Sequence, residues 1–334
     1  MEERALITGG AGFIGLHLAK ALLAQGVQVT LLDNFSRGRL DRDLQAILDN
    51  VTLIEHDLTQ PIPDTLLRTD YTHIYHMAAI VGVHISNEKP QHVLRTNVLA
   101  TIHLLDWCSR HSKATLCFAS TSEVYAGSVK LDIAPIPTPE TVPLTILDTA
   151  LPRYSYLSSK IVGEQLCLSY AQAYGFPVRI VRYHNVYGPR MGYDHVIPQF
   201  IQRLLERENP FPIYGAYQTR AFCYVDDAVE ATLQLMHAAL PGPLTVNIGN
   251  DQEEIQILAL AQKLFHVSEC YPQTAIYAPP PGSPERRCPD ITQLQHVTSY
   301  TPGVPLAQGL QKIYAWYQAE HERQSRSQLS STTL

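Results

Sequence analysis

Short apolar runs alternate with longer amphipathic segments along the first half of the chain. Apolar runs typical of buried strands occur at 5–8, 27–33, 51–57, 72–79 and 114–121. Helical patterns separate several of them, at 13–26 and 90–110, and a further strand is expected at 176–183 after a helix that spans 155–174. Alternation of strands and helices predicts an α/β fold with a doubly wound parallel sheet.

The pattern changes after about residue 185. Helical stretches are expected at 195–208, 226–239, 253–264 and 305–321, interleaved with short strands and proline-rich turns. We therefore predict a first domain at 1–184 and a smaller C-terminal substrate-binding lobe at 185–320, with excursions of the chain back to the first domain. The polar segment 321–334 is predicted to be a disordered tail.

Composition narrows the classes of protein. The chain has 334 residues, of which 45% are hydrophobic and 17% charged, and its net charge of -6 argues against binding to nucleic acid. No apolar run reaches membrane-spanning length, and a strand predicted at the very start leaves no room for a signal peptide. The six cysteines form no Cys-x-x-Cys pair, which is typical of reduced thiols in the cytoplasm. No spacing of metal ligands appears, so no metal is expected.

The stretch TGGAGFIG (8–15) carries the strongest local signal. It follows a predicted strand and opens a predicted helix, and Gly9, Gly12 and Gly15 fit a dinucleotide-binding fingerprint. Such glycines permit a tight turn and a close approach of the pyrophosphate. The first helical residues, Phe13 and Ile14, would then present backbone N–H groups to the phosphates. The pattern predicts a Rossmann-type, dinucleotide-binding first domain.

Acidic residues at two strand ends refine this prediction. Asp33 stands 18 residues after Gly15, where a carboxylate would bind the adenosine ribose and repel a 2′-phosphate, which favours NAD over NADP. Arg37 lies close enough to Asp33 to weaken this preference for NAD. Asp33 could also be a turn residue before Asn34. Asp57, after the third strand, would lie at the adenine or be an ordinary loop aspartate.

The octapeptide RYSYLSSK (153–160) offers a candidate catalyst. Residues four apart share a face of a helix, so Tyr156 lies over Lys160, whereas Tyr154 lies over Ser158. An ammonium beside a phenol favours the phenolate and should lower the pKa of the tyrosine. Tyr156 is therefore the candidate general base, although so short a motif also arises by chance.

Several further stretches occur in order along the chain: YHMAA (75–79), TNVLAT (96–101), STSEVYA (120–126), RYHNVYGPRM (182–191), YGAYQTRAFCYVDD (214–227) and ERRCPDI (285–291). With the two motifs above, the chain resembles the extended short-chain dehydrogenases/reductases of the nucleotide-sugar epimerase/dehydratase/decarboxylase group. The resemblance extends from Ala5 to about Tyr317. It implies bound NAD, a nucleotide-sugar substrate (a UDP-sugar), a 4-keto sugar intermediate and no net redox change.

The resemblance also implies roles for individual residues. Tyr156 would remove the proton of the sugar 4-hydroxyl, Lys160 would hold the nicotinamide ribose, and Thr121 would hydrogen-bond the same sugar oxygen. Further contacts with NAD are expected from Asn34, Leu58, Ala78 and Tyr183. Contacts with the substrate are expected from Val83, His184, Asn185, Arg220 and Arg287.

Some of these roles have alternatives. Arg220 and Arg287 would clamp the diphosphate or the sugar, or else form surface salt bridges. Asn185 would donate to the diphosphate or be a loop asparagine. His184 stands where relatives carry an aromatic residue and could equally be a packing histidine.

The triplet Thr121-Ser122-Glu123 bears on the reaction. Related dehydratases typically have an aspartic acid where Ser122 stands, which weighs against dehydration, whereas Thr-Ser-Glu is similar to UDP-glucuronate decarboxylases, with Arg287 near the carboxylate. Ala126 and the insert 131–144 depart from that pattern. A nucleotide-sugar 4-epimerase, a C5-acting epimerase or dehydratase, and a non-catalytic NAD-binding regulator stay open. The resemblance also implies a homodimer formed by the helices at 90–110 and 155–174.

Overall fold

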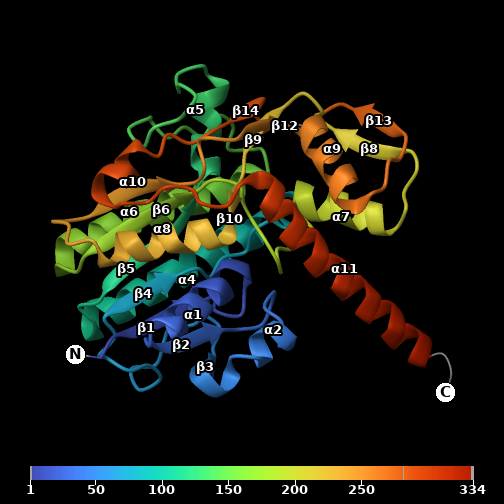
Figure 1. The fold of residues 1–334 in the computed structure, drawn as a ribbon. Helices are drawn as coiled ribbons and strands as arrows, with labels where there is room; N and C mark the ends of the chain where they lie inside the picture. The colour runs from blue at the N-terminus through green and yellow to red at the C-terminus, as the bar shows by residue number, and fades with distance from the viewer. Residues whose placement is uncertain (1, 281, 332–334) are drawn as a thin grey trace.

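A seven-stranded sheet forms the centre of the molecule (Figure 1). The structure, a computed structural model, describes residues 2–280 and 282–331. The strand order is β11-β6-β5-β4-β1-β2-β3, and every neighbouring pair is parallel. The strands are β1 (Arg4–Thr8), β2 (Gln28–Asp33), β3 (Val51–Glu55), β4 (His73–His76), β5 (Thr115–Thr121), β6 (Val178–Tyr183) and β11 (Leu244–Ile248). The predicted α/β fold with a doubly wound parallel sheet is confirmed.

Helices cover both faces of this sheet. Helices α4 (Pro90–His111) and α6 (Tyr154–Tyr174) pack together on one face, and α1 (Phe13–Ala24) and α8 (Val225–His237) contact each other on the other face. Alternate residues of β1 show the two sides. Leu6 belongs to one buried cluster with Leu104 of α4, whereas Ile7 belongs to a second cluster with Leu16 of α1. A strand buried on both faces must be apolar throughout, as the sequence pattern indicated.

Strand β11 is the part of the sheet that the hydrophobic pattern did not single out. It lies beyond residue 185 and pairs with β6 in the register Val246 to Val181. Residues from both sides of the predicted boundary at 184 therefore share one sheet. The boundary itself stays a prediction.

The remaining elements are short and lie mostly in the second half of the chain. Helices α7 (Val196–Leu205) and α9 (Ile257–Ser268) pack beside the strand pair β8 (Phe211–Tyr214) and β13 (Thr274–Tyr277) (Figure 1). Strands β12 (Glu254–Gln256), β9 (Thr219–Ala221) and β14 (Arg286–Arg287) form a small sheet, and β7 (Val186–Tyr187) pairs with β10 (Cys223–Tyr224). The other short helices are α2 (Arg42–Gln45), η1 (Leu48–Asn50), α3 (Val83–Glu88), η2 (Ser122–Tyr125), α5 (Ala126–Lys130) and α10 (Thr292–Val297).

Two predicted helices, those expected at 253–264 and 305–321, differ most from the structure. The helix expected from residue 253 begins at Ile257, because residues 254–256 pair with β9 as strand β12. The prediction of a disordered tail from residue 321 is wrong for 321–331, since helix α11 (Leu306–Ser331) continues through them and extends away from the rest of the fold (Figure 1). Glu, Arg and Gln favour helix even without an apolar face, and Arg323 pairs with Glu320 one turn away. Residues 332–334 lie outside the described residues.

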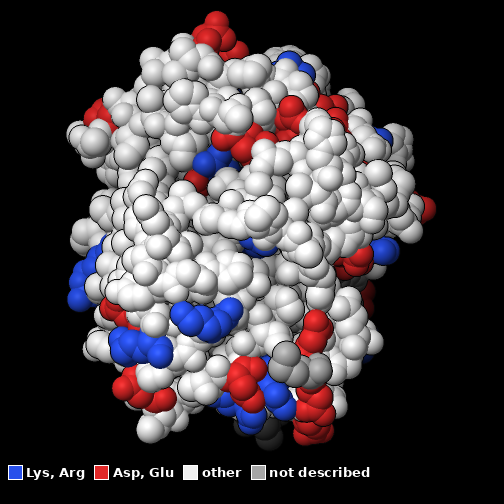
Figure 2. Space-filling model, turned by 90° about the vertical axis from the view of Figure 1, so that its left-hand side faces the viewer, with Lys and Arg blue, Asp and Glu red and all other residues white. Residues whose placement is uncertain are grey.

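The surface shown in Figure 2 is consistent with the low net charge. Acidic and basic side chains are scattered among uncharged ones on this face rather than gathered into one basic surface. Within 2–280 and 282–331, no helix combines the length and the apolar character that crossing a bilayer requires.

One ion pair is buried beneath the carboxyl ends of the strands. Arg182 at the end of β6 binds Glu164 of α6 through two nitrogens, with Nε–Oε1 and Nη2–Oε2 distances of 2.9 and 2.6 Å. Ser120 of β5 donates to the same carboxylate at 2.5 Å. Both charged side chains are only 7% exposed. The pair therefore connects α6, β5 and β6 in a region where water does not screen it.

We expect Glu164→Gln to lower the free energy of unfolding by about 3–5 kcal/mol, because it leaves the Arg182 guanidinium buried without its counter-charge. Glu208→Gln is the matched control. Glu208 pairs with Arg203 at 3.6 Å and its side chain is 45% exposed, so its loss should cost at most about 1 kcal/mol. Urea denaturation followed by circular dichroism measures both. Equal effects of the two substitutions would contradict the importance given to the buried pair.

Candidate active site

A large cleft runs along the carboxyl edge of the central sheet. Its volume is about 970 Å³, and it is lined by the turn after β1, the ends of β2, β4, β5 and β6, helix α3, the segment 190–197 and part of α11. In a doubly wound sheet, ligands bind at this edge. The cleft also contains most of the residues that the sequence nominated.

The glycine turn approaches its neighbours more closely than any side chain would allow. Gly9 adopts a φ of 68°, and a Cβ atom placed on it would lie 2.7 Å from the backbone nitrogen of Ala78. A Cβ on Gly15 would lie 2.3 Å from the carbonyl oxygen of Gly9. These contacts explain why glycine is required at both positions. They let α1 start directly against the turn.

The start of α1 is suited to an anion. Gly12 is the N-cap residue of this helix and provides no side chain to cap it, and Phe13 and Ile14 follow it on the lining of the cleft. The first N–H groups of a helix have no partner within the helix, and the helix dipole adds positive potential there. Turn and helix together fit the pyrophosphate of a dinucleotide.

Asp33 lies at the end of β2, on the lining of the cleft beside Asn34. Its carboxylate accepts hydrogen bonds from the backbone N–H groups of Ala11 at 3.0 Å and Phe35 at 2.9 Å. These bonds orient the carboxylate and leave further lone pairs for a ribose hydroxyl. Arg37 donates to the carbonyl oxygen of Val81 at 2.6 Å, so its guanidinium is engaged with the segment after β4.

The other residues predicted to contact the cofactor also line the cleft. They are Asp57, Leu58, Ala78, Tyr156, Lys160 and Tyr183. The Asp57 carboxylate accepts from the backbone N–H of Thr59 at 2.8 Å, which is the geometry of a turn aspartate. The Tyr183 hydroxyl shares a 2.8 Å hydrogen bond with Thr232 of α8.

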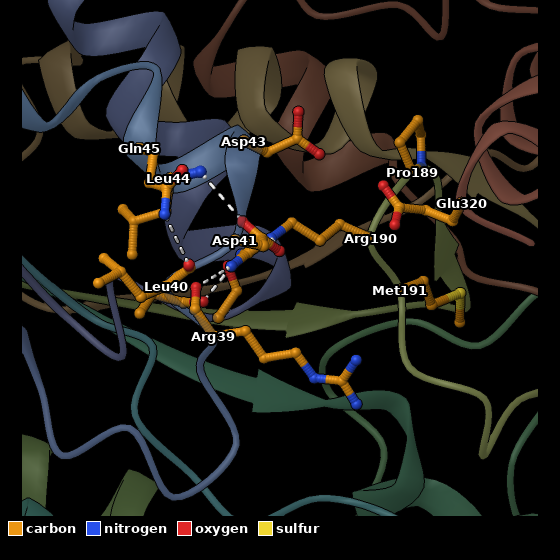
Figure 3. Close-up of polar contacts among 12 residues, drawn as sticks. Arg39, Leu40, Asp41, Asp43, Leu44, Gln45, Pro189, Arg190, Met191 and Glu320 are labelled. Atoms are coloured by element: carbon orange, nitrogen blue, oxygen red, sulfur yellow. Dashed lines mark hydrogen bonds and ion pairs between the residues drawn. The ribbon is translucent and has the colours of Figure 1, made fainter. Parts of the chain in front are cut away.

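Arg190 is a residue at this site whose role the sequence did not reveal. Figure 3 shows it reaching the segment 39–41. Its Nη1 donates to the carbonyl oxygens of Ala11 and Gly12 at 2.8 and 3.0 Å, and its Nε binds Asp41 at 2.6 Å. Burial acts to raise the pKa of the Asp41 carboxyl, but the hydrogen bonds from Arg190 and from the backbone outweigh it and the pKa is lowered. Arg190 therefore holds the glycine turn against the rim of the cleft.

Tyr156, and not Tyr154, faces the cleft. Tyr156 and Lys160 are both on its lining, whereas Tyr154 is buried in the core, with 5% of its surface exposed. Lys160 is buried as well. Its ammonium donates to the carbonyl oxygen of Ala119 at 2.7 Å and lies 5.9 Å from the centre of the Tyr156 ring.

The sequence predicted that Lys160 lowers the pKa of Tyr156. This prediction is wrong for the protein by itself, in which the pKa is raised. Burial and the negative charge of Glu123 raise the pKa of Tyr156, against a hydrogen bond with Thr121 that acts to lower it. Lys160 is directed at a backbone carbonyl and does not supply the opposing charge. Burial lowers the pKa of Lys160 itself to about 8. The tyrosine therefore needs another positive charge nearby before it can act as a base at neutral pH.

Glu123 and Arg287 form an ion pair next to Tyr156. Arg287 Nη2 lies 2.7 Å from Glu123 Oε1, and Arg153 lies 3.8 Å from Oε2 of the same carboxylate. Burial acts to raise the pKa of Glu123, but the charges of Arg287 and Arg153 outweigh it, so the pKa is lowered and the carboxylate stays charged. Ser122, Glu123 and Arg287 all line the cleft. A carboxylate and two guanidinium groups thus converge beside the candidate base.

Of the five residues predicted to contact the substrate, three line the cleft, namely Val83, Asn185 and Arg287, and two do not. Asn185 donates to the carbonyl oxygen of Ala221 at 2.8 Å and accepts from Arg287 at 3.4 Å, so it supports the arginine from the side away from Glu123.

The contact of His184 with the substrate stays a prediction, and the structure fits its alternative, a packing histidine. It is 1% exposed, and its Nε2 lies 3.1 Å from Oδ1 of Asn247. It lines a small hollow that shares Ser122 and Arg287 with the cleft, and burial lowers its pKa to about 3. His184 is thus a neutral packing histidine, because strand β6 ends before it and the chain turns it toward β11.

The contact of Arg220 with the substrate stays a prediction, and its charge acts on Glu123, which lines the cleft. Arg220 donates to the carbonyl oxygen of Thr219 at 2.7 Å and to Ser283 Oγ at 3.1 Å, and it is not on the lining of the cleft. Burial and the charge of Arg287 lower its pKa to about 9. Its position in the middle strand of the small sheet directs the side chain to the 283–285 loop.

Comparisons with known proteins agree with this geometry. The model of the NAD dependent epimerase/dehydratase family matches residues 5–249. The chain is 35% identical to a UDP-N-acetyl-alpha-D-glucosaminuronate decarboxylase of Bacillus cytotoxicus, over 95% of this chain and 98% of the relative. It is 34% identical to UDP-glucuronic acid decarboxylase 1 of Xenopus tropicalis, over 98% of this chain and 75% of the relative.

Solved structures show the same relation. The structure of UDP-glucuronic acid 4-epimerase from Bacillus cereus, in complex with UDP-glucuronic acid and NAD, matches with a TM-score of 0.82 and 28% identity, covering 95% of this chain and 99% of that one. UDP-glucose 4-epimerase from Thermotoga maritima with UDP-glucose also has a TM-score of 0.82, at 26% identity and with 95% and 99% coverage. The chain belongs to the NAD dependent epimerase/dehydratase family and is an NAD-dependent nucleotide-sugar enzyme.

Proposed function

We propose that the protein is a decarboxylase of a UDP-linked uronic acid, UDP-glucuronate or its 2-acetamido counterpart. The observation that carries this proposal is the ion pair of Glu123 with Arg287 beside Tyr156 and Thr121. A guanidinium at this point matches a carboxylate on the sugar. The decarboxylases from Bacillus cytotoxicus and Xenopus tropicalis, similar to this chain over almost its whole length, support the same reaction.

The first half of the reaction is oxidation at C4 of the sugar. Tyr156 removes the proton of the 4-hydroxyl, and the Thr121 hydroxyl holds the same oxygen in place. When bound, NAD would be held by the glycine turn, Asp33 and Lys160, and it would supply a hydride acceptor and a positive charge. Such a charge would favour the phenolate of Tyr156, whose pKa the protein alone raises.

The second half follows from the 4-ketone. The C5 carboxylate has become the carboxylate of a β-keto acid, so the C5–carboxyl bond can break and its electron pair can move into the ketone oxygen. Tyr156, now protonated, and Thr121 donate hydrogen bonds to the developing enolate. Water then protonates the enolate carbon. The hydride removed from C4 in the first half returns to C4, and Tyr156 gives its proton to the ketone oxygen, so there is no net redox change.

Arg287 is suited to position the carboxylate without holding it too strongly. A lone guanidinium would stabilise the charged carboxylate of the ground state and so oppose its loss. Here Glu123 already balances much of the charge of Arg287, at a distance of 2.7 Å. Arg287 can therefore orient the carboxylate while binding it less strongly than a lone guanidinium would.

The residue at position 122 separates this proposal from dehydration. Ser122 is 4% exposed and borders the cleft, and a serine hydroxyl is a much weaker acid than the aspartic acid of the dehydratases. Epimerisation at C4 shares the first half-reaction and is the competing outcome, since a UDP-glucuronic acid 4-epimerase has the same fold. The products distinguish the three reactions.

We expect purified protein to convert UDP-glucuronate or UDP-N-acetylglucosaminuronate into a product that is lighter by one carbon dioxide, as shown by mass spectrometry. UDP-glucose, which lacks the carboxylate, should not lose mass. A new isomer of unchanged mass would identify an epimerase instead, and loss of water would identify a dehydratase.

The same assay tests Arg287 with a matched control. Arg287→Gln should raise KM for the uronate roughly 10- to 100-fold, because a charge-assisted contact to the substrate is lost. Arg286→Gln should leave KM nearly unchanged, since Arg286 is half exposed and pairs with Glu254. Similar effects of the two substitutions would count against a role of Arg287 in binding the carboxylate.

Tyr156→Phe should lower kcat by about 10²–10⁴ because it removes the general base, while titration should show NAD still bound. Tyr154→Phe serves as the control and should keep near-normal turnover, since Tyr154 lies in the core. If the Tyr154 variant loses turnover and the Tyr156 variant keeps it, the assignment of the base is wrong.

We also infer that the protein is a cytoplasmic homodimer that pairs through helices α4 and α6. The two helices lie side by side, and each exposes a large apolar residue, Leu94 at 38% and Val162 at 41%. All six cysteines are free thiols, which fits a reducing compartment.

Light scattering after size exclusion should give the mass of two chains, because joining these helices would bury the exposed apolar side chains. Leu94→Glu with Val162→Glu should give the mass of one chain. Leu131→Glu, at a 50% exposed residue that follows α5, should leave the mass unchanged. A wild-type protein with the mass of one chain would contradict the dimer.

A further inference from the structure

Three possible metal ligands meet at the amino edge of the central sheet, away from the cleft. Glu3 immediately precedes β1, His73 begins β4, and His237 ends α8. Strands β1 and β4 are neighbours, with Ala5 opposite His73, so their starting residues lie together. One ring nitrogen of each histidine and one carboxylate oxygen of Glu3 all lie within 4.8 Å of one another.

A hydrogen bond fixes how the His237 ring is protonated. Its Nδ1–H donates to the carbonyl of Leu233 at 2.7 Å, which leaves Nε2 with its lone pair. Nδ1 of His73 lies 3.1 Å from the Thr72 hydroxyl, which also contacts the carbonyl of Arg4 at 2.9 Å. Histidines that ligate metals are held in the same way, by a hydrogen bond from the other ring nitrogen.

The spacing of these groups is close to that of a coordination shell. Glu3 Oε1 and His237 Nε2 are 3.5 Å apart. Two ligands at about 2.0–2.1 Å from a tetrahedral zinc ion lie roughly 3.4 Å from each other. A shift of up to about 1.4 Å would bring the third atom from at most 4.8 Å to the same spacing. The Glu3 and His237 side chains are exposed and can move by that amount.

The electrostatic environment also suits a cation. The Glu3 carboxylate supplies a negative charge to the group, and the Met236 carbonyl oxygen lies near the His73 ring. Arg4 is directed elsewhere, to Glu2 and Asp70.

We propose that Glu3, His73 and His237 form a site for Zn²⁺, with two imidazole nitrogens and one carboxylate oxygen as ligands. The Glu3 and His237 side chains are 42% and 38% exposed, so an ion can reach the site from solvent, and water completes its coordination. Bound zinc joins the starts of β1 and β4 to the end of α8. Its role is structural, because the cleft lies at the opposite edge of the sheet.

A search of the sequence for closely spaced metal ligands does not find this site, because its ligands are 70 and 164 residues apart (3 to 73 and 73 to 237). The expectation of no metal rested on such spacing. Only the pairing of β1 with β4 and the packing of α8 bring the three residues together.

Zn²⁺ added to chelator-treated, full-length protein should bind with a stoichiometry of one in isothermal titration calorimetry. At a hundredfold excess over Kd it should raise Tm on the order of 4 °C for a chain of this size. His237→Gln and, separately, Glu3→Gln should weaken binding at least tenfold and remove the rise in Tm, while turnover of nucleotide sugar without zinc stays normal.

His266→Gln is the matched control. His266 is also exposed, also in the last turn of a helix, and contacts the Tyr271 hydroxyl at 3.2 Å. This substitution should leave both the affinity for Zn²⁺ and the rise in Tm unchanged. If wild type shows no saturable binding, or if the Glu3 and His237 variants bind Zn²⁺ as tightly as wild type, the site is disproved.

Discussion

The buried ion pair between Glu164 and Arg182 determines where the proposed catalytic groups stand. Glu164 belongs to α6, the helix that also carries Tyr156 and Lys160, and Arg182 belongs to β6. Ser120 at the end of β5 donates to the same carboxylate, and the next residue is Thr121, whose hydroxyl faces the same site. Tyrosine and threonine thus reach the same point of the cleft because one bidentate contact fixes helix and strands relative to each other. A hydrophobic contact could hold these elements together but would not fix their relative positions so closely.

A second polar centre extends this framework to the substrate side. Asn247 of β11 accepts from the Tyr125 hydroxyl at 2.9 Å and donates to the carbonyls of Thr138 and Asp290. The backbone of Thr138 in turn bonds both Cys288 and Asp290. Cys288 follows Arg287 directly, and Asp290 comes two residues after Cys288. The proline-rich insert at 131–144 is therefore part of the structure that supports the guanidinium, and strand β11 connects that structure to the central sheet.

A feature of the fold or of the site could be predicted from the sequence where residues nearby in the chain determine it. The glycine turn, the buried strands and the face shared by Tyr156 and Lys160 follow from periodicities within a few residues. Strand β11 is only five residues long and mixes polar with apolar side chains, so its partner β6 decides its state. The places of His184 and Arg220 depend on packing against β11 and the 283–285 loop, which no local pattern encodes. The sign of the Tyr156 pKa shift could not be predicted either, since it depends on where Lys160 points and on the approach of Glu123.

Glu123 links the two halves of the proposed reaction. Its charge raises the pKa of Tyr156, which by itself makes the tyrosine a poorer base for the first step at neutral pH. The same charge holds Arg287 and offsets it, so that a substrate carboxylate can be oriented without being trapped. Once the ketone has formed, a tyrosine of high pKa keeps its proton and can donate to the enolate oxygen. The charge of Glu123 therefore hinders the oxidation but helps the cleavage of the carbon–carbon bond. This explains why a glutamate stands at position 123, where a small neutral residue would suit oxidation alone.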